Sequence, residues 1–169
     1  YYVFNSFSQA CTTFVGQNYG AGQIKRCKRT LLLCLIEDSL TSIAAILLIL
    51  CSGKFLLSLF NRDSQVISIG YERLVIIFIA YCFSMLYEVM SGYLRGFGIS
   101  LVPAILTTIG VCGTRIGWVY AVFPKDRPFR TLLLAYPASL SITAVLILAA
   151  LLIYHPAHRN ERSKQDSSY

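Results

Sequence analysis

Hydrophobic positions along the chain gather in long runs separated by short polar or basic stretches. A helix of ~20 residues crosses the ~30 Å hydrocarbon core of a bilayer. Four runs reach that length: 30–52, 74–94, 101–123 and 131–154. A fifth run, 1–18, is shorter, and we expect it to be the end of a span that begins upstream. The pattern predicts an all-α, polytopic transmembrane bundle of about five membrane helices.

The connections predict where the helices begin and bend. Residues 54–60 are too few to span and too apolar for water, so we expect a small helix in the membrane interface. The next helix is free to begin near Ser64. We expect Ser100 to cap the helix after it, with Pro103 tolerated in the first turn. Pro137 lies inside the last run, where it should kink the helix.

A dense basic cluster at 25–29 follows the first run. Short loops rich in Lys and Arg stay on the cytoplasmic side of a membrane. The other connections then alternate, with 53–73 and 124–130 outside and 95–100 and the tail inside. We therefore divide the chain into a membrane part, 1–154, and a polar cytoplasmic tail, 155–169. We expect the stretch from Arg159 to Tyr169 to be disordered.

Composition supports this picture, because 56% of the 169 residues are hydrophobic and only 14% are charged. A net charge of +7 would suit nucleic acid, but the Lys and Arg residues lie in loops and form no basic face with stacking aromatics, which argues against that partner. The six cysteines are scattered singly, with no partner spacing for zinc, and we expect them to be small apolar fillers. Without H-E-x-x-H or G-x-S-x-G we expect neither an enzyme nor a cofactor.

Glu88 is the candidate for chemistry, since an ionised carboxylate inside a span costs about 2.5–3.5 kcal/mol at the helix centre. A modest change of surroundings can switch such a group between protonated, cation-bound and salt-bridged states. The alternative is that Glu88 only hydrogen-bonds Tyr or Ser side chains of a neighbouring helix. Tyr87 and Ser84 are its near neighbours on the same helix.

Two further acids, Glu37 and Asp38, lie at a depth similar to that of Glu88, and the three could form one layer. Adjacent carboxylates point about 100° apart on a helix, so they cannot share one partner. We favour the alternative that they pair with Lys28 or Arg29 of the basic loop.

Arg115 either snorkels to the outer surface or faces a polar cavity. Its depth differs from that of Glu88 by roughly 10 Å at the helical rise, so we do not expect a direct pair. The first run is unusually polar and should line the bundle interior. Asn5, Gln9 and Thr12 or Thr13 form a stripe along it, suited to a wet cavity or to interhelical hydrogen bonds.

Three glycine pairs fit the small-x-x-x-small pattern of close helix contact: Gly16 and Gly20, Gly92 and Gly96, and Gly113 and Gly117. Two of them belong to longer motifs. These are Gln9-Ala10 followed by Phe14-Val15-Gly16-Gln17-Asn18-Tyr19-Gly20-Ala21-Gly22, and Gly92-Tyr93-Leu94-Arg95-Gly96-Phe97-Gly98 with Pro103 after it.

In order and separation, these motifs resemble those of the multidrug and toxin extrusion (MATE) transporters. That resemblance implies twelve helices in two pseudo-symmetric lobes, and export of drugs or organic cations in exchange for sodium ions or protons. It makes 1–154 a partial second transmembrane lobe, from the end of the eighth helix to the twelfth. Several members of the family bind the coupling cation through a carboxylate one turn further from the Leu-Arg-Gly motif, where this chain has Ser84. Glu88 either replaces that carboxylate or does not.

Our hypothesis is therefore an antiporter in a bacterial plasma (inner) membrane, with a cationic drug-like substrate, the lipid bilayer and the N-terminal lobe of the same chain as partners. The ion-coupling or substrate-binding residues would be Glu88, Tyr87, Ser84, Asn5 and Gln9, with Arg115 and Gln17 in the cavity. The structural motif residues are Gly16, Gly20, Gly22, Gly92, Arg95, Gly96 and Pro103. The alternatives are a flippase for lipid-linked oligosaccharides, which needs a more basic cavity, and a non-transporting membrane scaffold.

Overall fold

The computed structural model describes residues 1–60, 62–121, 131 and 133–154. All of its regular structure is helical, which confirms the predicted fold class. The elements are α1 (Tyr2–Gly20), α2 (Ile24–Phe60), α3 (Ser64–Gly96), α4 (Leu101–Thr108), the π-helical η1 (Ile109–Gly113), α5 (Thr114–Ala121) and α7 (Ala135–Tyr154). Four stretches are long and apolar enough to cross a membrane: Ile24–Phe60, Ser64–Gly96, Leu101–Tyr120 and Ala135–Tyr154.

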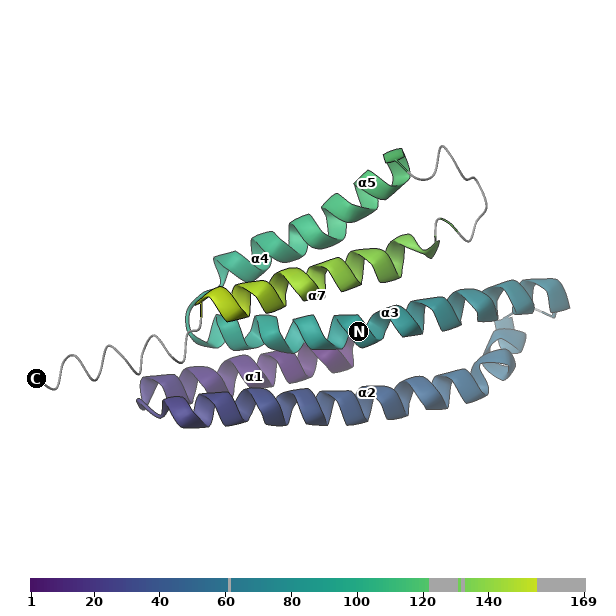
Figure 1. Cartoon of the computed structure of the whole chain (residues 1–169). Coiled ribbons are helices and arrows are strands. Elements are labelled where there is room, and N and C mark those ends of the chain that lie inside the picture. Colours follow the sequence, from purple (N-terminus) through teal and green to yellow (C-terminus); the bar gives the residue numbers. More distant parts are fainter. Residues whose placement is uncertain (61, 122–130, 132, 155–169) are drawn as a thin grey trace, which may run out of the picture.

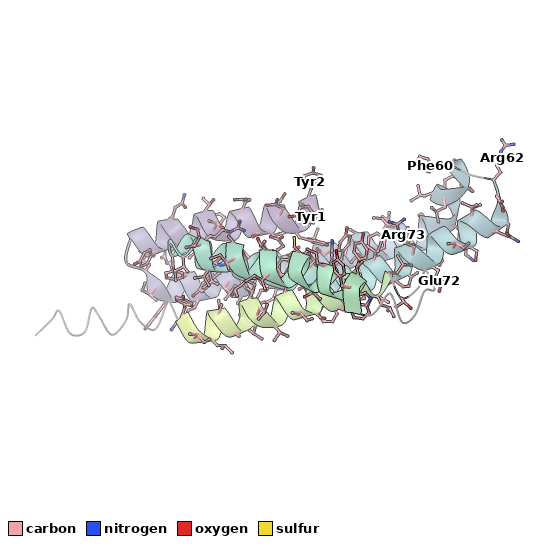
Figure 2. The ribbon with its side chains drawn as sticks, turned by 90° about the horizontal axis from the view of Figure 1, so that it is seen from above. Tyr1, Tyr2, Phe60, Arg62, Glu72 and Arg73 are labelled. Carbon is pink, nitrogen blue, oxygen red and sulfur yellow. The ribbon has the colours of Figure 1, made fainter. Side chains whose placement is uncertain are left out.

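The helices run lengthwise beside one another, with α3 between α1 and α2 on one side and α7 on the other (Figure 1). The segment α4–η1–α5 packs on α7. The helix α1 accompanies only the half of α3 that ends at Gly96, so Tyr1 lies about midway along α3, while Phe60 and Arg62 lie at the far tip (Figure 2). The connections 21–23 and 97–100 meet at one end of the bundle, as the alternating topology requires (Figure 1).

Glycine ends both helices at that shared end. Gly22 and Gly98 have φ of 71° and 82°, a conformation that costs other residues a clash with their own Cβ. The turn at Gly98 places its amide 2.9 Å from the carbonyl oxygen of Arg95, and the amide of Ile99 3.1 Å from that of Leu94. These paired bonds are the Schellman motif, which satisfies the last carbonyls of a helix.

The structure differs from expectation around the far connection. Residues 54–60 continue α2 instead of forming a separate interface helix, because nothing in this stretch breaks the helix. Gly53 is tolerated there, since it packs against the ring of Tyr71. The helix α3 begins at Ser64 as predicted, and the side chain of Asp63 caps it by accepting a 2.8 Å hydrogen bond from the amide of Gln65.

Two expectations for later helices hold only in part. Ser100 occupies the N-cap position of α4, but its side chain makes no capping bond. The last helix is disturbed just before Pro137, but by a break rather than a kink: Thr131 and Leu133 are helical, Leu134 forms a turn, and α7 begins at Ala135. Pro137 therefore lies in a first turn, where a missing amide costs little. The predicted loop 124–130 and tail 155–169 lie outside the described residues.

Two clusters of buried side chains hold the bundle together. One joins α1, α2 and α3 and consists of Cys11, Val15, Cys27, Cys34, Val89 and Tyr93. The other joins α3 to α7 and consists of Ala80, Tyr87, Met90, Leu140, Ala144 and Ile147. Three cysteines thus serve as small apolar fillers. Large apolar side chains such as Leu48 and Val145 remain exposed on the outer surface, as a lipid-facing bundle requires.

Candidate functional site

A cleft of about 430 Å³ opens between α3, the segment α4–η1–α5 and α7. Its walls combine hydroxyl groups, aromatic rings and one group of each charge. The lining residues are Tyr1, Tyr81, Ser84, Tyr87, Glu88, Thr107, Thr108, Val111, Cys112, Arg115, Tyr136 and Leu140. Three of the predicted ion-coupling residues therefore share a single cleft.

Helical spacing explains why α3 supplies the acidic wall. Ser84 and Glu88 are four residues apart and Tyr81 precedes them by a turn, so all three lie on one face. Ser84 and Tyr87 are buried, whereas Glu88 is half-buried and reaches the cleft. The hydroxyl group of Tyr1 is 3.4 Å from Oε1 of Glu88, a long contact for a hydroxyl donor. The carboxylate therefore keeps acceptor capacity for a bound group.

Arg115 faces the cleft from the opposite wall. Its Nε donates a 3.2 Å hydrogen bond to Oγ of the fully buried Ser139, and its guanidinium carbon lies 4.4 Å from the centre of the Tyr136 ring. This cation–π arrangement favours the polar-cavity alternative over snorkelling. Glu88 and Arg115 line the same cleft, but no ion pair is described between them. The guanidinium of Arg115 instead contacts two residues of α7, Ser139 and Tyr136.

The other two acids diverge as expected for neighbours on a helix. Glu37 is exposed, whereas Asp38 is only 1% exposed. Oδ1 of Asp38 accepts a 2.8 Å hydrogen bond from Ser42, one turn further along α2. Its Oδ2 has no hydrogen-bond partner among the described residues. Neither acid lines the cleft, so the structure does not assemble the three-acid layer around it.

The polar stripe of α1 is not part of the cleft. Gln9 is exposed and donates a 3.4 Å hydrogen bond to Asn5 within its own helix, and Gln17 is exposed near the helix end. The buried face of α1 is instead formed by Phe4, Ser8, Cys11 and Val15. Thr12 at the edge of that face donates a 3.0 Å bond to the carbonyl oxygen of Gly92, which fits the interhelical alternative.

Ser8 was not among the candidate site residues, although it is fully buried beside Glu88. Its Oγ donates a 2.6 Å hydrogen bond to the main-chain oxygen of Glu88 and accepts a 2.8 Å bond from Nη2 of Arg95. The signal for it was the Gly92 and Gly96 pair, because close approach at those glycines brings the neighbouring helix within hydrogen-bonding distance.

The glycines explain how α1 comes so near. A Cβ on Gly96 would lie 2.6 Å from Cβ of Val15, and one on Gly92 would collide with the main chain and hydroxyl group of Ser8. Gly16 completes the contact, since a Cβ there would be 3.6 Å from the Gly96 oxygen. The third pair behaves differently: a Cβ on Gly117 would have no neighbour within 4 Å in the described part of the chain.

Comparison with known proteins extends these observations. A family model described as MatE matches residues 1–121. Multidrug and toxin extrusion protein 1 from Homo sapiens is 30% identical over 119 residues, covering 69% of this chain and 21% of that protein. The protein of the same name from Mus musculus is 29% identical over the same length, with the same coverage. The chain thus spans about a fifth of the length of these relatives.

A crystal structure of the eukaryotic MATE transporter AtDTX14 has the same arrangement of helices. It matches with a TM-score of 0.75 and 18% sequence identity, over 96% of this chain and 37% of that one. The fold, the family model and the two glycine motifs agree. The chain is a multi-pass membrane protein that belongs to the MatE family.

Proposed function

We propose that the chain is part of a secondary active antiporter that exports drugs or organic cations in exchange for sodium ions or protons. One observation carries the proposal: a half-buried carboxylate, Glu88, lines a cleft inside a membrane bundle of the MatE family. An acid held among apolar helices is costly, and such groups mark ion and substrate pathways in membrane proteins.

The cleft has the chemistry that this function needs. A carboxylate attracts a cation, and the rings of Tyr81, Tyr87 and Tyr136 offer π-faces for an aromatic or quaternary ammonium group. A sodium ion or proton on Glu88 would neutralise it and weaken its hold on a cationic substrate. Competition for a single acid therefore links ion entry to substrate release, provided that each ligand favours a different conformation of the bundle.

The rest of the proposal concerns the surroundings of the cleft. We propose that the N-terminal lobe of the same chain faces it across the transport pathway, that the lipid bilayer surrounds both, and that the tail from residue 155 lies in the cytoplasm of a bacterial cell. The names of the relatives, multidrug and toxin extrusion protein 1, support the substrate class. The function is transport, with no chemical conversion of the substrate.

The test is efflux of a cationic dye from proteoliposomes that contain the full-length protein, driven by an imposed sodium or proton gradient. Glu88→Gln removes the charge at nearly constant size, and we expect ion-driven efflux at least about tenfold slower. Glu37→Gln is the matched control, since Glu37 is an exposed acid on α2, and it should transport at the wild-type rate. Unchanged, fully coupled efflux by Glu88→Gln would exclude Glu88 from the mechanism.

A further inference from the structure

Arg95 lies near the cytoplasmic end of α3, yet its side chain turns back into the bundle. It follows Glu88 by seven residues, two helical turns, so the two share a face. Long helical side chains point toward the N-terminus of their helix, which directs this guanidinium toward Glu88. Nη2 reaches Oγ of Ser8, and Nε is buried without a hydrogen-bond partner among the described residues. Arg95 is partly exposed, but its Nε and Nη2 lie between α1 and α3.

Ser8 connects that cation to the turn that carries the acid. A serine hydroxyl donates one hydrogen bond and accepts others, and Ser8 uses both capacities. It accepts from Arg95 at 2.8 Å and donates to the main-chain oxygen of Glu88 at 2.6 Å. The side chain is fully buried, so water does not compete for either bond.

The helix contact around Ser8 holds this arrangement in place. Gly92 and Gly96 admit α1 to main-chain distance, and Thr12 adds a 3.0 Å bond to the Gly92 oxygen. Contacts between main chains leave little freedom to shift without losing hydrogen bonds. The position of Arg95 relative to Glu88 is therefore set by the packing of α1 on α3.

We infer that Arg95, held by Ser8, is the internal counter-charge that stabilises the ionised form of Glu88, and that both act as positioning residues for it. This inference deepens the proposed function and rests on the role given there to Glu88. The arginine of the Leu-Arg-Gly motif would then have an electrostatic role in addition to its place before the turn at Gly98.

The ionisable groups around Glu88 come from several elements: Tyr1 at the start of α1, Tyr87 and Arg95 on α3, and Arg115 on α5, with Asp38 on α2 outside the cleft. Asp38 opposes the ionised form, because it is a second negative charge when ionised. Arg115 is already bonded to Ser139 and stacked on Tyr136. Arg95 is the cation that is tied to the helical turn of Glu88, through the two hydrogen bonds of Ser8.

The test measures protonation of Glu88 without using transport. Dicyclohexylcarbodiimide reacts with protonated carboxyl groups in membranes, and mass spectrometry quantifies its adduct on Glu88 in the full-length protein in proteoliposomes. At one fixed pH near neutrality, Arg95→Gln should increase labelling at least about twofold, because the carboxylate loses a favourable charge. Arg95→Lys keeps the charge and should stay near wild type. Lys25→Gln, a neutralised exposed cation of the basic loop, should leave labelling unchanged.

Ser8→Ala provides a second, charge-neutral test. It frees Arg95 from the position near Glu88, so labelling should rise above wild type while Thr13→Ala, on the exposed face of α1, has no effect. Should Arg95→Gln fail to give a monodisperse protein, Ser8→Ala and Arg95→Lys decide the matter. Wild-type labelling in Ser8→Ala, or in a folded Arg95→Gln, would overturn the inference. If labelling rises in these variants but the wild type shows no ion-driven efflux, the proposed function is wrong and the inference about Arg95 still holds.

Discussion

At the scale of single residues, the absence of a side chain on Gly92 permits the contact between α1 and α3. A Cβ there would meet the main chain of Ser8, which cannot move aside as a flexible side chain can. We expect Gly92→Ala to lower the stability of the folded protein by about 1–3 kcal/mol through overpacking. Thermal unfolding of the full-length protein in detergent measures the change.

Gly117→Ala is the matched control for that experiment, because Gly117 is helical and has no neighbour within 4 Å among the described residues. It should unfold at the wild-type temperature or slightly above it, since alanine is the better helix former. Equal unfolding temperatures for Gly92→Ala and Gly117→Ala would contradict the close contact between Gly92 and Ser8.

The sequence alone predicted some residues of the site and not others. Glu88 stood out because a charge within an apolar run is expensive wherever the helix packs. The burial of Ser8 could not be deduced in the same way, since serine is common on every face of a membrane helix and only the partner across the interface decides its role. Asn5 and Gln9 were assigned to the cleft by their stripe, but α1 presents its Phe4, Ser8 and Cys11 face to its neighbours.

At the scale of the elements, the ends of α1 and α3 depend on glycine in the left-handed region. Gly98→Ala should cost about 1 kcal/mol, because an L-residue at φ of 82° is strained even though no atom lies within 4 Å of a Cβ there. The midpoint of thermal unfolding should fall accordingly.

Gly20→Ala tests whether the conformation, rather than the loss of a glycine, is responsible. Gly20 is the last residue of α1 and likewise has open space around it, but its φ is not in the left-handed region. It should be neutral or slightly stabilising. A Gly98→Ala protein as stable as Gly20→Ala would argue against a strained turn at residue 98.

The element that the hydrophobic pattern could not reveal is η1. Its i→i+5 bonding winds more loosely than an α-helix, so the residues after it, Arg115 among them, face a different side from that of an unbroken helix. Gly110 allows this turn to press against Thr143 of α7. A face counted at 100° per residue assumes an unbroken α-helix, so the hydrophobic pattern could not predict which side of this segment Arg115 faces.

At the scale of the whole molecule, the shared end of the connections 21–23 and 97–100 makes the orientation testable. In a cysteine-free background of the full-length protein, Ser100→Cys should react with a membrane-impermeant maleimide only from the cytoplasmic side, and Ser64→Cys only from outside. Both positions are exposed. We expect the end with the basic loop to be the cytoplasmic one, because short loops rich in Lys and Arg stay inside. The reverse pattern of labelling would invert the topology, and labelling of both positions from one side would contradict the crossing of α3.

The two walls of the cleft are built differently, and this difference has a mechanical consequence. The helix α3, which bears Glu88, contacts the main chain of α1 directly, and Ser8 and Thr12 hydrogen-bond across this contact. We therefore expect α1 and α3 to move as one rigid body. The wall that bears Arg115 packs on α7, which meets α3 through side chains, and this wall contains the π-helical turn η1. If the cleft widens and narrows, we expect the segment that bears Arg115 to move while Glu88 stays in place.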